Sequence, residues 1–156
     1  MSLSGIISQL VVLIAAVPTV GQVYGYDRIA VMDDQVEAVF GYTDTSASRG
    51  WTIRAWMLDR LTTEEILLTN VQTQARHTLR LQGYWEVNDL VGSRAAFRTV
   101  TEAIRTVLRG TTSLGADAEL VEPPVVVEDG IAVLGGETYV VHAVAIHLVA
   151  QELIFL

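Results

Sequence analysis

Hydrophobic and polar residues alternate along residues 75–82, near the middle of the chain. His77, Leu79 and Leu81 occupy every second position, and Arg76 and Arg80 lie between them. Because successive side chains of a strand point to opposite faces, a period of two predicts a half-buried β-strand. We expect one face of this strand to be apolar and the other to carry the two arginines.

The pattern changes after Gly83, which we interpret as a break that ends the strand. Apolar residues then recur at steps of three and four, as on one face of an amphipathic helix; they are Phe97, Val100, Ile104, Val107 and Leu108. The opposite face holds Arg94, Arg98, Glu102 and Arg105. Asn88 or Asp89 can cap the start of this helix, and Gly110 can take the left-handed conformation that ends one.

Two further patterns predict regular structure. Apolar residues at helical spacing over residues 3–17, with Ser2 or Ser4 as a cap, predict a helix that ends before Pro18. A strand is predicted over residues 51–61, and the Gly135-Gly136 pair between residues 125–134 and 138–150 predicts a β-hairpin.

The other segments are shorter. We expect an extended piece at residues 21–26, one or two helical turns at 33–40, a polar loop at 41–50, a single helical turn at 62–70 and a turn-rich connection at 111–117. Together these elements predict an α+β fold in a single domain spanning residues 1–156. Its sheet would be mostly antiparallel, with four to five strands and two main helices packed on it.

The composition adds an excess of apolar residues. The hydrophobic fraction is 51% with only 18% charged residues, and the mean hydropathy is +0.39. A membrane span needs about 18 to 20 consecutive apolar residues, whereas residues 10–17 and 139–150 are the longest runs and two histidines interrupt the second. No Lys or Arg precedes Arg28, so the charged start of a signal peptide is also missing. We therefore expect no membrane contact, and apolar surface that copies of the chain or partners cover.

Charge and cysteine content exclude several classes of protein. The net charge is −8, from 18 acidic residues against 10 arginines and no lysine, which argues against a protein that grips nucleic-acid phosphates. The chain has no cysteine, which excludes disulfides, thiolate metal sites and cysteine nucleophiles.

No catalytic or metal-binding constellation is recognisable. His142 and His147 lie five residues apart on one predicted strand, and this odd offset points them to opposite faces, so they cannot share a metal ion. His77 would still need a carboxylate partner to complete a site. No nucleophile elbow, phosphate-binding glycine loop or zinc-protease motif is present. We expect no enzyme, no cofactor and no metal.

Some residues are candidates for contacts between subunits or with partners. Tyr84 and Trp85 follow the predicted break and can anchor a neighbouring subunit. Arg94, Arg98 and Arg105 would form either a solvated helix face or salt bridges between subunits. The chain finishes with Phe155 and Leu156, and an apolar terminus of this kind is expected to dock on something.

Several of these stretches also resemble a known family. They are residues 23–28, Gly50-Trp51-Thr52-Ile53-Arg54, the run Leu81-Gln82-Gly83-Tyr84-Trp85-Glu86-Val87-Asn88-Asp89, and the helix with Ser93, Phe97, Val100 and Ile104. With the apolar first helix and the closing hairpin, their order resembles the tail terminator or tail completion (neck) proteins of long-tailed bacteriophages and prophages. The Leu-Gln-Gly-Tyr-Trp stretch is the most specific part.

The resemblance implies a structural protein of the virion that forms a homo-oligomeric ring, typically a hexamer. Such a ring caps the tail tube, stops its polymerisation and joins it to the head, so its partners would be the tail tube protein and the head-completion or connector protein. DNA would pass through the lumen without specific binding. The protein would be assembled in the cytoplasm of the bacterial host and reside in the tail or neck. The alternatives are another neck or head-completion adaptor, or a small α+β ligand-binding or enzymatic domain.

Overall fold

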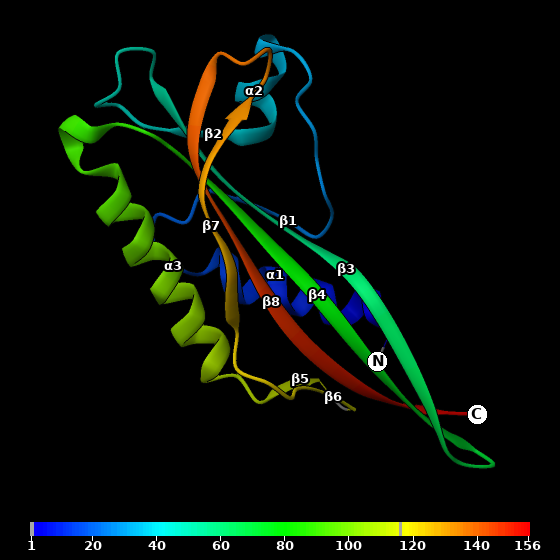
Figure 1. Cartoon of the computed structure of the whole chain (residues 1–156). Helices are drawn as coiled ribbons and strands as arrows, with labels where there is room; N and C mark the ends of the chain where they lie inside the picture. Colours follow the sequence, from blue (N-terminus) through cyan, green and yellow to red (C-terminus); the bar gives the residue numbers. More distant parts are fainter. Residues whose placement is uncertain (1, 116) are drawn as a thin grey trace.

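The computed structural model describes residues 2–115 and 117–156, and Figure 1 shows how their helices and strands are arranged. In chain order the elements are α1 (Leu3–Ala15), β1 (Gln22–Tyr24), α2 (Asp33–Phe40), β2 (Gly41–Thr43), β3 (Trp51–Thr69), β4 (Gln72–Glu86), the 3₁₀ helix η1 (Asp89–Val91), α3 (Ser93–Arg109), β5 (Ser113–Gly115), β6 (Ala118–Leu120), β7 (Val125–Leu134) and β8 (Tyr139–Phe155).

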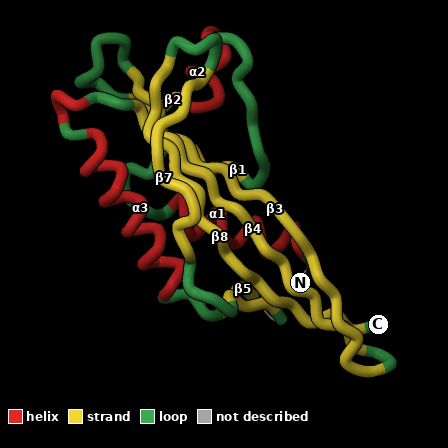
Figure 2. Tube along the Cα trace, in the orientation of Figure 1, coloured by secondary structure: helices red, strands yellow, loops and turns green. Residues whose placement is uncertain are grey.

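All the strands belong to one sheet, which is mixed (Figure 2). The order is β1-β3-β4-β8-β6-β5, with β2 also paired to β3 and β7 also paired to β8. β1 runs parallel to β3, and the other pairs are antiparallel. The three long strands β3, β4 and β8 lie side by side and form the middle of the sheet.

The fold class predicted from the sequence is therefore wrong in three respects. The described residues form eight strands and three α-helices, where four to five strands and two helices were expected. The sheet is mixed because β1 joins it in parallel. Strands β1, β2, β5 and β6 have only three residues each, which is too short for an alternating pattern to be recognised.

The alternation along β4 is confirmed and extends further than expected. Every second residue from Ala75 to Trp85 is buried, and the strand passes through Gly83 without a break, so the interpretation of Gly83 as a strand end is wrong. A Cβ atom at Gly83 would lie 2.3 Å from Cζ3 of Trp56 on the neighbouring strand. The glycine makes room for the indole and does not form a turn.

One face of the sheet packs against α1 and α3. The side-chain oxygen of Ser2 caps α1 by accepting from Gly5 N at 3.3 Å, and the spacing of Ile6, Leu10 and Ile14 buries one side of the helix. The apolar stripe predicted for α3 is buried at Phe97, Val100, Ile104 and Leu108, whereas Val107, which was also predicted to belong to it, is exposed. These side chains share a core with every second residue of the long strands, among them Trp56, Leu58, Leu79, Leu81, Val144, Ile146 and Leu148.

A second, smaller core lies on the opposite face under α2. The intervening residues of β3, Ile53, Ala55 and Met57, pack there against Val36 and Phe40. The ring of Phe40 meets the ring of Tyr84 edge to face, with centroids 5.6 Å apart. Because side chains alternate along β3, this strand contributes residues to both cores, one core on each face of the sheet.

Several local predictions need correction. Residues 62–70 continue β3 and its turn and do not form a helical turn. Gly110 has φ −78°, so it is not left-handed, whereas Gly92 has φ 68° and precedes the first residue of α3. Asn88 lies ahead of η1 and its side chain makes no capping hydrogen bond. Short strands β5 and β6 occupy part of the segment expected to be turns.

The sheet continues beyond the helices at one end. There the β3–β4 hairpin and the end of β8 project as a narrow three-stranded extension, which lies near the C-terminus in Figures 1 and 2. The register pairs Ile66 with Gln74 and Gln74 with Leu153. We call residues 61–76 together with residues 151–156 the arm.

The close approach at Gly83 gives a first prediction. We expect Gly83→Ala to lower the free energy of unfolding by about 1–3 kcal/mol, because the added methyl group overlaps the Trp56 ring. Gly130→Ala is the matched control, since nothing lies within 4 Å of a Cβ atom at that strand position. Urea unfolding of both variants measures the difference. Equal stabilities would contradict the steric explanation.

Candidate functional site

The arm carries the largest group of exposed apolar side chains in the described part of the chain. At its end are Ile66, Leu67, Leu68 and Val71 around the hairpin turn and Phe155 and Leu156 at the C-terminus, with exposed fractions from 46% to 76%, and Leu61 at its base is 45% exposed. The backbone N of Leu156 donates to the carbonyl of Val71 at 2.8 Å, so the C-terminal residues lie against the turn. The apolar terminus therefore docks on its own hairpin, but the side chains of Phe155 and Leu156 remain exposed.

Tyr84 and Trp85, the other apolar candidates, lie in the cores. Trp85 is 5% exposed, between the ring of Phe97 at 5.9 Å and the guanidinium of Arg54 at 4.1 Å. Tyr84 is half-buried in the second core; burial, and then the negative charge of Asp27, raise the pKa of its hydroxyl. Both rings thus make their contacts within their own chain.

Two of the four arginines of α3 bind groups of their own chain. Arg94 makes two hydrogen bonds to the carboxylate of Asp129 on β7, at 2.7 and 2.9 Å. Arg105 pairs with Glu102 at 2.8 Å and also donates to the carbonyl of Pro124. Arg98 lines a groove between α3 and β7. The sequence could not show the Arg94 pair, because Asp129 lies 35 residues further along the chain.

The opposite face of the sheet contains an open groove of about 500 Å³. Arg80, Gln82 and Tyr84 line it from β4, and Glu128 lines it from β7. Arg80 donates to Glu128 at 3.1 Å and lies opposite Asp59 on β3.

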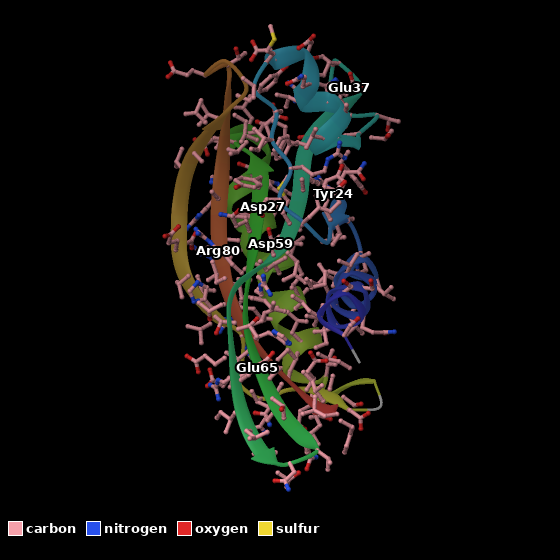
Figure 3. The ribbon with its side chains drawn as sticks, turned by 90° about the vertical axis from the view of Figure 1, so that its right-hand side faces the viewer. Tyr24, Asp27, Glu37, Asp59, Glu65 and Arg80 are labelled. Carbon is pink, nitrogen blue, oxygen red and sulfur yellow. The ribbon has the colours of Figure 1, made fainter. Side chains whose placement is uncertain are left out.

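Asp27 lies in the same region of the molecule (Figure 3). Burial, and then the charge of Asp59, raise the pKa of the Asp27 carboxyl. The cation of Arg80 thus has carboxylates around it from its own chain. This arrangement joins β3, β4 and β7 and leaves little positive charge to attract an anion.

The histidines lie in separate polar clusters. His77 Nε2 lies 2.9 Å from Glu152 Oε1, and its Nδ1 lies 2.8 Å from Thr63 Oγ1. His142 Nε2 lies 2.9 Å from Ser93 Oγ. His147 is half-buried and lies on β8 opposite Arg80 of the neighbouring strand β4. Over residues 2–115 and 117–156, no group of three or more histidine or acidic side chains is placed to hold a metal ion.

The cluster of Thr63, His77 and Glu152 has the hydroxyl, imidazole and carboxylate order of nucleophilic catalysis. The side chains of His77 and Glu152 are each only 5% exposed, so the imidazole is closed to a substrate from solution. One residue comes from each of β3, β4 and β8, and the row lies where the large core meets the arm. Its evident role is to connect the three strands at the base of the arm. The sequence pattern indicated His77 but not this row, because the partners of His77 are 14 and 75 residues away along the chain.

This buried row gives a second prediction. His77→Leu should lower the free energy of unfolding by about 1–3 kcal/mol, because Glu152 Oε1 loses a buried hydrogen-bond partner. The double variant His77→Leu/Glu152→Leu should recover part of this loss, since both polar partners are then replaced by apolar side chains. Urea unfolding measures both variants. A single variant that costs less than about 1 kcal/mol would contradict the structural role.

His142 gives a prediction on pH. Burial, and then the positive charge of Arg94, lower the pKa of His142 below the ordinary 6.5. When the pH falls below 6.5, His142 takes up a proton in the unfolded chain before it does so in the folded one. This difference lowers the free energy of unfolding by at most about 1.4 kcal/mol per pH unit. The free energy of unfolding should therefore decline less steeply in His142→Asn than in the wild type between about pH 7 and 5. Identical slopes would exclude His142 as the cause.

Comparison with models of known protein families finds no match to this chain, and comparison with curated proteins finds none. Among the described residues, no helix combines the length and the apolar character needed to cross a membrane. The function must therefore be argued from the resemblance in the sequence and from the surfaces described above.

Proposed function

We propose that the protein is a tail terminator of a long-tailed bacteriophage or prophage. In this proposal it is a structural subunit of a ring, typically of six copies, that caps the tail tube, stops its polymerisation and joins the tail to the head. Its partners are other copies of itself, the tail tube protein and the head-completion or connector protein. It is assembled in the host cytoplasm and resides in the virion. The identification as a phage protein rests on the sequence resemblance.

The structural observation that carries the proposal is the arm. Isolated soluble proteins rarely expose apolar patches larger than a few hundred Å², yet six large apolar side chains surround the end of this narrow extension. No described helix covers them. An element of this kind suits a protein whose neighbours in an assembly bury it.

The charge distribution agrees with a channel through which DNA passes. The net charge is −8, and five of the ten arginines pair with carboxylates of the same chain, namely Arg49, Arg76, Arg80, Arg94 and Arg105. Paired arginines are poor at neutralising phosphates. A ring built from such subunits would let duplex DNA pass without holding it.

The alternative of a small ligand-binding domain has one supporting observation, the groove of about 500 Å³ beside Tyr84. Binding pockets are mostly apolar and enclosed, with a few polar groups that converge on the ligand. In this groove Arg80 is already paired with Glu128. We therefore favour the structural role, and the closely related role of another neck or head-completion adaptor stays as the second choice.

The proposal is tested by native mass measured over a range of concentrations, with negative-stain images of the same sample. We expect a discrete ring of about six copies, which is a closed homo-oligomer of cyclic symmetry, with a central hole wide enough for duplex DNA. Purified tail tubes incubated with the protein should stop growing. A stable monomer that also fails to cap tail tubes would overturn the proposal.

A charged substitution tests whether the arm contributes to assembly. Leu67→Asp places a carboxylate among the apolar side chains of the arm and should weaken association roughly tenfold or more. Leu90→Asp is the control, because Leu90 is 98% exposed and lies on η1, away from the arm. Circular dichroism verifies that both variants fold. Equal loss of the ring in both variants would contradict a specific role for the arm.

A further inference from the structure

The apolar side chains of the arm lie on both faces of its strands. Side chains alternate along a strand, so Ile66 and Leu67 point to opposite faces. Phe155 pairs in register with Gln72, and Leu156 follows it beside Val71. A partner that lies flat on one side therefore covers only part of the apolar side chains of the arm.

The exposed area of the arm is close to what a stable interface needs. With six large side chains 46% to 76% exposed, the arm offers an apolar surface on the order of several hundred Å², the size at which exposed apolar patches mark interaction sites. A standard protein interface buries about 800 Å² on each partner, polar atoms included. The arm could thus supply most of one side of a subunit contact.

A second apolar segment runs from the middle of the molecule toward the end opposite the arm. Tyr26, Ile29, Val31 and Met32 are 58%, 78%, 72% and 61% exposed. They belong to the connection between β1 and α2, which leads to α2 at the end of the molecule opposite the arm (Figure 1). We call residues 26–32 the β1–α2 segment.

The β1–α2 segment has local contacts that fix its path. The backbone N atoms of Val31 and Met32 both donate to Gln35 Oε1, at 3.1 and 3.3 Å, and the N of Arg28 lies 3.2 Å from the sulfur of Met57. The backbone is therefore held while the side chains face solvent. Such a preformed apolar surface loses little conformational entropy when a partner covers it.

We infer that the arm of one copy docks on the β1–α2 segment of a second copy. This inference rests on the proposed ring and specifies the contact that would form it. Two different surfaces of one chain make a heterologous contact, and repeating such a contact closes a ring when the rotation is suitable. Contact between two arms would instead give a two-fold dimer and leave the β1–α2 segment uncovered.

Within one copy the two surfaces are too far apart to touch. Ile29 follows Arg28, which contacts Met57 on β3, and Leu67 lies ten residues further along that strand. At about 3.3 Å per residue, the two surfaces are roughly 30 Å apart. A short cross-link between residues 29 and 67 can therefore form only between copies.

The absence of cysteine allows a direct test. We expect the double variant Ile29→Cys/Leu67→Cys, treated with a short bis-maleimide, to give a ladder of covalent oligomers on a denaturing gel. Each single variant should give at most a dimer, because one thiol per chain cannot extend a ladder. Leu67→Cys/Leu90→Cys is the matched control, since Leu90 is more exposed than Ile29, and it should give no ladder.

A double-mutant cycle supplies an independent readout. Ile29→Asp should weaken association roughly tenfold, as Leu67→Asp does, because each replaces an apolar contact residue with a charge. If the two residues share one interface, the association affinity of the double variant should fall much less than the roughly hundredfold expected from two independent sites. Sedimentation velocity over a range of concentrations measures these losses.

The outcomes separate this inference from the proposed function. If native mass shows a ring but the variant Ile29→Cys/Leu67→Cys gives no ladder of cross-linked oligomers, the inference is overturned and the terminator proposal stands. A ladder from the Leu90 control, or strong dimers from Leu67→Cys alone, would also overturn it, the latter in favour of contact between two arms. A protein that stays monomeric and does not cap tail tubes overturns both.

Discussion

The pairing of the three long strands β3, β4 and β8 is the constraint on which the rest of this structure depends. Along β3, neighbouring residues belong to different cores, since Trp56 packs under α1 and α3 while Ala55 and Met57 pack under α2. A shift of the register by one residue would send each set of side chains to the wrong face. The helices on both faces therefore fix the register, and the register in turn places the arm.

Polar contacts add cross-links where apolar packing ends. Thr63, His77 and Glu152 form a buried row across the three strands at the base of the arm. On the outer strand β7, Asp129 binds Arg94 of α3 and Glu128 binds Arg80 of β4. Each of these contacts joins elements that are distant in sequence, so the charged residues mainly hold the sheet and α3 together.

The sequence predicted the elements whose side chains repeat over many residues. The alternation along β4 and the stripe of α3 were recognised because one face of each is buried for several turns or pairs of residues. The three-residue strands are too short to show such a pattern. Gly83 was misread because its neighbour Trp56 lies on another strand. The partners of Arg94 and His77 could not be predicted for the same reason: the pattern along the chain contains no information on contacts between strands, or between a helix and a strand.

The arm also differs from the rest of the molecule in how cooperatively it is held. Beyond the Thr63–His77–Glu152 row, strand pairing fixes its backbone without support from a described helix. Regions with few buried apolar contacts open at a much lower free energy than the core to which they are attached. The arm can therefore fray and close again while the two cores stay intact, and amide hydrogen exchange there would become slow only when another molecule encloses it.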